Sequence, residues 1–123
     1  MDESDLIDRY CRVWNEPDAD RCAELLASVW ATDATYTDPS VHAPNADSLL
    51  SHIAKVRERR PGAKILRTCQ VDVHHGLARF AWHVVQADGN ALPEGLDLVF
   101  LTPDGRRIER IVGFFGPLTR ESE

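Results

Sequence analysis

Three residues of types that perform acid–base chemistry stand out from their surroundings in the sequence: Asp97, Tyr10 and Asp38. Asp97 interrupts the segment 95–101, whose other residues are apolar or glycine. Burial of a carboxyl group raises its pKa, because an apolar environment disfavours the charged form. A buried Asp97 is then a protonated hydrogen-bond donor. The alternative is an Asp97 at a sheet edge or bulge, exposed or paired with an arginine of a neighbouring strand.

Tyr10 and Asp38 each have a structural and a functional interpretation. Tyr10 and Trp14 lie one helical turn apart, so their side chains share one face of a helix, as core aromatic residues often do. The hydroxyl of a buried tyrosine still needs a partner, for which Asp97 or a ligand oxygen is a candidate. Asp38 precedes Pro39, and its carboxylate either binds backbone N–H groups of the turn or moves a proton at a pocket entrance.

The histidines and cysteines indicate neither a metal nor a cofactor. His42 follows Asp38 in a loop that can close over a pocket, whereas His52 is expected to be half-exposed on a helix. The sequence contains no H-x-x-x-H, H-x-H, G-x-S-x-G or phosphate-binding glycine motif. Its three cysteines form no C-x-x-C pair, which argues against a zinc site and a disulfide framework. We therefore expect reduced thiols and a cytoplasmic location.

The first half of the chain is expected to be mainly helical. Apolar residues recur at helical spacing over 5–15, from Asp18 to Trp30, and again before Pro61-Gly62. Between the second and third helices, the β-branched and aromatic segment 34–37 predicts a short strand. A turn at 38–40 and a loop at 41–45 are expected to follow this strand.

Four strand-like runs make up the second half, over 65–73, 77–86, 95–102 and 106–115. The Asp-Gly pairs between the later runs are hairpin signals. This order predicts a single α+β domain over 1–123, in which three N-terminal helices pack on one face of an antiparallel sheet.

The last two strands are apolar on both faces, although the helices can cover only one face. Alternation predicts that Leu96, Leu98 and Phe100 point away from Val99 and Leu101, and that Ile108, Val112 and Phe114 point away from Ile111 and Phe115. We expect a second copy of the sheet to cover the remaining face, which makes the protein a homodimer.

Composition and charge exclude several classes of protein. The chain has 123 residues, of which 43% are hydrophobic and 28% charged, as in an ordinary globular domain. Its net charge of −6 opposes binding to nucleic acid and to anionic membranes. No apolar stretch is long enough to cross a bilayer, and the acidic N-terminus differs from a secretory signal.

The order of these patterns resembles the nuclear transport factor 2-like (NTF2-like) superfamily and, within it, the SnoaL-like polyketide cyclase group. The resemblance extends from Leu6 to Pro117 and rests on the Tyr10–Trp14 helix and the segments 31–39, 80–82 and 112–116. It implies a cystatin-like cone, with a curved sheet wrapped around the helices to form a mostly apolar pocket. The residues that would line this pocket for a ligand are Trp14, His42, Phe80, Trp82 and Phe115.

The residues also resemble the ketosteroid isomerase-like members of this superfamily, with Tyr10, Asp38 and Asp97 at the matching positions. In those enzymes an aspartate moves a proton next to a carbonyl group, while a tyrosine and a protonated aspartate stabilise the enolate. Thr37 departs from the pattern, because the family has a glutamate there. The resemblance implies isomerisation or cyclisation of a small hydrophobic carbonyl compound. The alternatives are a non-catalytic carrier of a small hydrophobic ligand and a dimerising interaction module.

Overall fold

Three helices form close to where the sequence predicts them. The computed structural model describes residues 2–121, and its helices are α1 (Glu3–Asn15), α2 (Ala19–Val29) and α3 (Ala46–Arg59). Each helix begins after a residue whose side chain accepts hydrogen bonds from the first turn, namely Asp2, Asp18 and Asn45. No helix in the described part of the chain is both long enough and apolar enough to cross a membrane.

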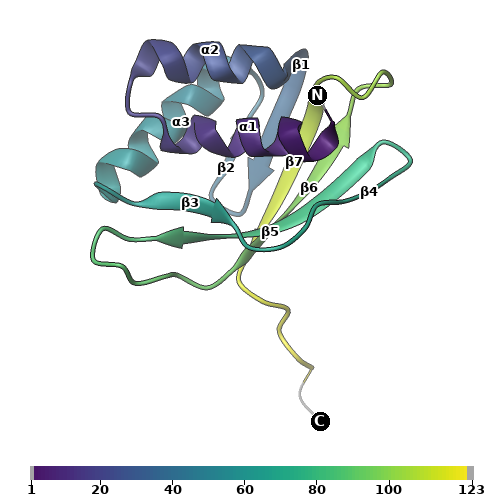
Figure 1. Ribbon diagram of the computed structural model, residues 1–123. Coiled ribbons are helices and arrows are strands. Elements are labelled where there is room, and N and C mark those ends of the chain that lie inside the picture. Colours follow the sequence, from purple (N-terminus) through teal and green to yellow (C-terminus); the bar gives the residue numbers. More distant parts are fainter. Residues whose placement is uncertain (1, 122–123) are drawn as a thin grey trace.

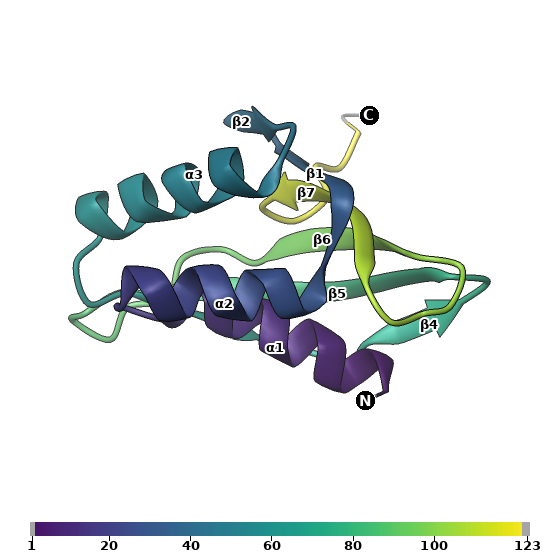
Figure 2. The ribbon, with the colours of Figure 1, turned by 90° about the horizontal axis from the view of Figure 1, so that it is seen from above.

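The strands form one seven-stranded sheet against which the helices pack. They are β1 (Trp30–Asp38), β2 (Val41–Ala43), β3 (Lys64–Arg67), β4 (Asp72–His74), β5 (Leu77–Val85), β6 (Gly95–Leu101) and β7 (Ile108–Phe115). Their order is β2-β1-β7-β6-β5-β3, and β4 also pairs with β5. Figures 1 and 2 show a strongly twisted sheet with the helices gathered on one side of it. The α+β architecture predicted from the sequence is confirmed.

The strands differ from the prediction most clearly in three places. β1 begins at Trp30 instead of residue 34, because Trp30 pairs with Ile108 of β7, and this β1–β7 pairing is parallel within a sheet that is otherwise antiparallel. The segment 41–43, expected to be a loop, is a strand paired with β1. The run 65–73 is split into β3 and β4, because the four residues 68–71 lie opposite only two residues of β5, Phe80 and Ala81. Within this bulge the N–H of Ala81 donates to Cys69 Sγ at 3.1 Å.

The core lies between the helices and the inner face of the sheet. Burial alternates along β6, so that Asp97, Val99 and Leu101 face the helices and the residues between them face outward. Ile108 is fully buried with Ile111 and does not share the outer face with Val112 and Phe114 as predicted. The reason is a register shift between β6 and β7 at Phe100/Leu101, which reverses the alternation.

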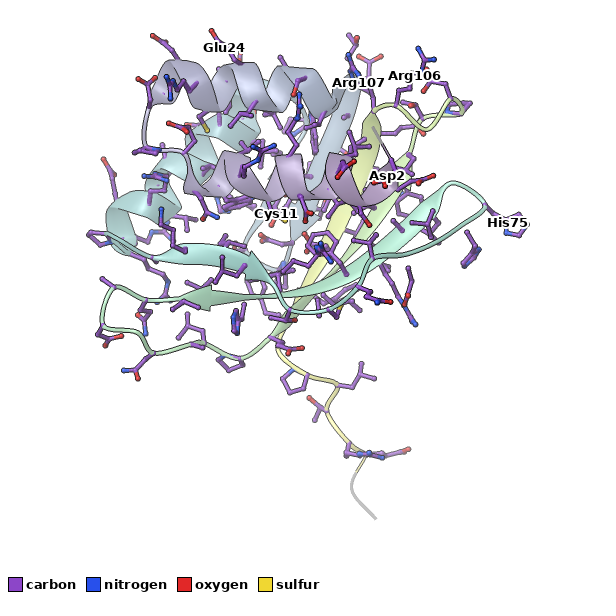
Figure 3. The ribbon with its side chains drawn as sticks, viewed as in Figure 1. Asp2, Cys11, Glu24, His75, Arg106 and Arg107 are labelled. Atoms are coloured by element: carbon purple, nitrogen blue, oxygen red, sulfur yellow. The ribbon has the colours of Figure 1, made fainter. Side chains whose placement is uncertain are left out.

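The loops at the far end of the sheet lie away from α3. Figure 3 shows His75 in the turn between β4 and β5, and Arg106 and Arg107 in the turn between β6 and β7. The same view shows side chains filling the space between α1 and the sheet, including that of Cys11, which is 7% exposed. The described cysteines are all free thiols.

Candidate active site

The helices and the inner face of the sheet surround a cavity of about 500 Å³. This volume lies within the range of pockets that bind small organic ligands. The cavity has polar side chains from α1, α3, β1 and β6 at one end. Arg59 and Arg60 also line it, and the rest of the wall is mainly apolar, with the aliphatic residues Val56, Ile65, Val84, Leu92 and Pro93.

Asp97 points into this cavity from the centre of β6. It is 5% exposed, and its Oδ1 accepts a hydrogen bond of 2.9 Å from the indole Nε1 of Trp82. Burial raises the pKa of Asp97 to about 7; the Trp82 hydrogen bond opposes this rise, and the negative charge of Asp38 adds to it. Asp97 is therefore largely protonated below neutral pH, as predicted for a carboxyl group in an apolar strand.

Two glycines make room for this arrangement. A Cβ on Gly113 would lie 2.7 Å from Oδ1 of Asp97 and 3.5 Å from Cβ of Asp38. Gly113 pairs with Asp97 in the sheet, and the next strand on its other side carries Asp38. A Cβ on Gly95 would lie 2.3 Å from the Trp82 ring, so only a glycine leaves space for the indole. Both glycines thus allow Asp97 and its donor to occupy the inner face.

Tyr10 faces the cavity from α1 and is hydrogen-bonded within its own helix. Trp14 Nε1 donates to the Tyr10 hydroxyl oxygen at 2.9 Å, so Trp14, and not Asp97, is the partner of this hydroxyl. Among residues 2–121, no acceptor takes the hydroxyl proton. Burial raises the pKa of Tyr10 well above its ordinary value, which keeps the hydroxyl protonated. Tyr10 can therefore donate to a ligand oxygen.

Asp38 is anchored at the end of β1 by hydrogen bonds to both of its carboxylate oxygens. Oδ1 accepts from Ser40 N at 2.7 Å, Ser40 Oγ at 2.7 Å and Val41 N at 3.1 Å. Oδ2 accepts from the Tyr36 hydroxyl at 2.6 Å. Oδ1 of Asp38 therefore binds backbone N–H groups of the turn, which is one of the two roles considered for this residue. The same side chain also lines the cavity. Oδ2 accepts one hydrogen bond and Oδ1 accepts three, so Oδ2 is the oxygen with a lone pair left to take up a proton.

His52 and Tyr36 belong to the same polar cluster, although the sequence analysis did not include them in the site. His52 Nε2 lies 3.9 Å from Asp38 Oδ2, and burial lowers the pKa of His52, which makes the ring neutral at neutral pH. Two signals could have identified them. Tyr36 precedes Asp38 by two residues and thus shares its strand face. His52 follows Leu49 by three residues and precedes Val56 by four, which places it on the inner face of α3.

The aromatic residues predicted to line the pocket do so, but His42 does not. Trp14, Phe80, Trp82 and Phe115 all border the cavity, and the rings of Trp82 and Phe115 meet edge to face at 6.1 Å. His42 is exposed, and its Nδ1 lies 2.7 Å from Thr37 Oγ1. His42 pairs with Thr37 in the sheet. Thr37 faces away from the cavity, because its neighbours in β1, Tyr36 and Asp38, face inward. The prediction for His42 is therefore wrong.

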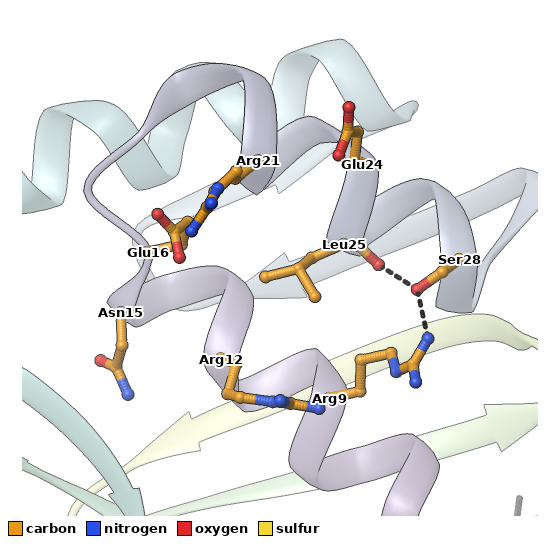
Figure 4. Close-up of a pocket in the computed structure, with 8 residues that line it drawn as sticks. All are labelled: Arg9, Arg12, Asn15, Glu16, Arg21, Glu24, Leu25 and Ser28. Carbon is orange, nitrogen blue, oxygen red and sulfur yellow. Dashed lines mark hydrogen bonds between the residues drawn. The ribbon is translucent and has the colours of Figure 1, made fainter.

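A second hollow of about 550 Å³ lies between α1 and α2. Figure 4 shows its charged side chains, including Arg9, whose Nη1 is 3.5 Å from Ser28 Oγ. None of the predicted site residues borders this groove. Within residues 2–121 there is also no group of three or more histidine, cysteine or acidic side chains arranged to hold a metal ion. The cavity at Asp97 is the candidate active site.

Comparison with solved structures identifies close relatives of this fold. A proposed isomerase of the SnoaL-like family from Agrobacterium tumefaciens str. C58 is 30% identical, with a TM-score of 0.85 over 93% of this chain and 97% of that chain. An NTF2-like protein of unknown function from Exiguobacterium sp. 255-15 is 19% identical, with a TM-score of 0.64 over 88% and 95% of the two chains. A proposed polyketide cyclase from Sinorhizobium meliloti is 16% identical, with a TM-score of 0.66 over 89% and 93%. No protein-family model and no curated protein sequence matches the chain.

Proposed function

The chain belongs to the SnoaL-like family, with an NTF2-like fold, and from this premise we propose that it is an acid–base enzyme for a small, largely apolar carbonyl compound. The observation that carries the proposal is the presence of two buried aspartates with opposite surroundings in one apolar cavity. Asp97 has a pKa raised to about 7 by burial, whereas Asp38 accepts four hydrogen bonds. Such a difference separates a hydrogen-bond donor from a proton acceptor.

In this mechanism the substrate carbonyl oxygen lies against Tyr10 and Asp97. Asp38 Oδ2 takes a proton from the carbon next to the carbonyl, and the electron pair of that C–H bond moves to the oxygen to form an enolate. The Tyr10 hydroxyl and the protonated Asp97 donate hydrogen bonds to this oxygen as its negative charge develops. The indoles of Trp14 and Trp82 polarise these two donors or hold them in place.

The fate of the enolate determines the product. If Asp38 returns the proton to a different carbon, the product is an isomer of the substrate. If the carbanion attacks a second carbonyl group of the same molecule, a ring forms. Isomerisation is the preferred version, because the 30% identical relative is a proposed isomerase. Cyclisation is supported only by proposed polyketide cyclases of low identity, which share the fold.

A non-catalytic carrier of a small hydrophobic ligand is the second candidate. It is favoured by the fact that Tyr10 and Asp97 each already have a tryptophan partner, as polar groups of an inert core would. The cavity walls, which are mainly apolar, serve a carrier equally well. The two candidates differ in whether a bound ketone exchanges its protons.

The experiment that separates them is proton exchange in deuterated water. A panel of β,γ-unsaturated ketones is incubated with the protein, and exchange next to the carbonyl is followed by NMR. An enzyme accelerates exchange, and Asp38→Asn lowers this acceleration by about 10²–10⁴-fold. His42→Gln is the control, because His42 lies outside the cavity. Binding without accelerated exchange supports the carrier.

A homodimer remains part of the proposal. The outer face of the sheet carries Leu66 and Phe114, which are 46% and 55% exposed, beside the outward-facing apolar residues of β6. A two-fold axis would bury the same patch on both copies. Sedimentation at micromolar concentration is expected to give twice the chain mass, and Phe114→Asp is expected to shift the protein to monomer. A monomeric wild type would contradict this expectation.

A further inference from the structure

The segment 55–64 has a charge opposite to that of the whole protein. It contains five basic residues and one acidic residue, Glu58, whereas the chain has a net charge of −6. The basic residues are Lys55, Arg57, Arg59, Arg60 and Lys64. This segment includes the C-terminal end of α3, where cations also complement the helix dipole. The dipole accounts for positive charge at this end, but not for its place on a cavity wall.

Two of these arginines, Arg59 and Arg60, line the candidate active site. Both are exposed, and neither takes part in an ion pair within the described part of the chain. Arg60 makes one hydrogen bond to a neutral group, from Nη1 to Gln86 Oε1 at 3.3 Å. Arg57 is different, because its Nη1 donates to the backbone oxygen of Trp14 at 3.2 Å. Arg59 and Arg60 are therefore free to bind an anion.

The cavity has two polar ends separated by an apolar middle. Arg59 follows His52 by seven residues on α3, which corresponds to about 10 Å along the helix axis. His52 lies beside Asp38 at the acid–base end. Val56, an aliphatic residue of the cavity wall, lies between His52 and Arg59 on α3. A ligand that spans the cavity therefore meets hydrogen-bond donors at one end and guanidinium groups at the other.

Charge determines which end of such a ligand an anionic group would occupy. A carboxylate or phosphate at the acid–base end would lie near the negative charge of Asp38, which already raises the pKa of Asp97. The same group beside Arg59 and Arg60 would form charge-assisted hydrogen bonds with planar guanidinium donors. Attraction at one end and repulsion at the other would fix the orientation of the ligand.

The geometry points to a substrate that carries an anionic group, a carboxylate or a phosphate, at the end remote from its reacting carbonyl, with Arg59 and Arg60 as its binding residues. This inference rests on the proposed function for the position of the carbonyl. It adds the chemical class of the substrate: an acid with an apolar body, which is held by its charge and reacts at its other end.

Calorimetry with a matched pair of probes tests this inference. The probes are para-hydroxyphenylpropionate and its amide, which have the same shape and the same phenol but differ in charge. Wild type is expected to bind the carboxylate about tenfold more tightly than the amide. The double variant Arg59→Gln, Arg60→Gln is expected to remove this preference while its affinity for the amide stays within about twofold. Added salt should also weaken the preference, because these arginines are exposed.

The control variant is Arg106→Gln, which removes the same charge from the turn between β6 and β7, away from α3. It is expected to keep the tenfold preference. A third probe, para-hydroxyphenethyl phosphate, distinguishes the two anions: tighter binding than that of the carboxylate, dependent on the same two arginines, indicates a phosphorylated substrate.

The outcomes separate this inference from the proposed function. Equal affinities for carboxylate and amide in wild type, or a preference that survives in the double variant, overturn the role of Arg59 and Arg60. If the amide still binds to wild type and binds more weakly to Tyr10→Phe, the acid–base site is supported without a role for Arg59 and Arg60. If neither neutral nor charged phenol binds, both proposals fail.

Discussion

Asp38 and Asp97 face the same cavity from strands on either side of β7, but their surroundings differ in hydrogen bonding. Asp38 lies at a strand end, where a turn supplies the N–H groups of Ser40 and Val41 and the hydroxyl of Ser40. Asp97 lies in the middle of a strand, where the backbone groups pair with neighbouring strands and a single indole reaches its side chain. The position of a carboxylate within a strand thus controls how many donors stabilise its charge.

This difference teaches that one fold can surround the same residue type with very different numbers of hydrogen-bond donors. A turn offers free N–H groups that point toward one centre, and a central strand offers none, because its N–H groups are already used in the sheet. The following predictions test whether the two aspartates are as different in solution as these contacts indicate.

The largest effect is expected for Asp97→Asn on stability. The pKa of Asp97 is raised from its usual 3.8 to about 7 in the folded protein. Between these two pH values the carboxyl group is therefore protonated in the folded protein and ionised in the unfolded chain. Wild-type stability therefore falls as pH rises from about 4 to 7 and is then constant, with a total loss of about 4 kcal/mol. Asparagine avoids this loss and keeps an acceptor for Trp82. Urea unfolding at pH 5 and pH 8 measures the stability of the variant relative to wild type, and the gain of the variant should be larger at pH 8. An equal difference at the two pH values would contradict the raised pKa of Asp97.

Asp38→Ala is expected to destabilise the protein by about 2–4 kcal/mol. The substitution leaves the Tyr36 hydroxyl and the N–H groups of the turn without their acceptor. Ser40→Ala, which removes only one of the donors, should cost about 1 kcal/mol and serves as the matched control. Unfolding by urea measures both. A neutral effect of Asp38→Ala would mean that the turn finds water instead, and that Asp38 is less anchored than its four hydrogen bonds indicate.

Gly113→Ala is expected to disturb Asp97 more than Asp38. The added Cβ would lie 2.7 Å from Asp97 Oδ1, which forces a movement, but 3.5 Å from Asp38 Cβ, an ordinary contact. The expected cost is about 1–3 kcal/mol. In the double variant Gly113→Ala, Asp97→Ala the obstructing oxygen is absent, so the two effects should not add. Additive effects would show that Gly113 is required for a reason unrelated to the carboxylate.

The smallest effect is expected for Trp82→Phe, which removes the indole N–H that donates to Asp97 Oδ1. Because this hydrogen bond lowers the pKa of Asp97, its loss should move the pKa further upward. The carboxyl carbon chemical shift of Asp97, followed by NMR against pH, measures the change. Trp14→Phe is the control, because Trp14 donates to Tyr10. A shift of equal size in both variants would assign the effect to general loosening of the cavity.

The sequence by itself was sufficient for the fold class, for the contact between Tyr10 and Trp14 and for the burial of Asp97. Helical spacing identified Tyr10 and Trp14 as neighbours, and the apolar run around Asp97 indicated its burial and its raised pKa. Both inferences depend on local geometry, because the periods of helices and strands are set within a few residues of chain.

Tertiary structure alone decided which of these groups meet and with what partners. His52 and Asp38 are brought together by the packing of α3 on β1, and His42 is turned away by its pairing with Thr37. The indole above Gly95 and the place of Gly113 between two carboxylates depend on strand register. Register shifts also moved Ile108 to the inner face. Such contacts join residues far apart in the chain, and their geometry depends on how the whole sheet twists and pairs, which no local pattern of residues specifies.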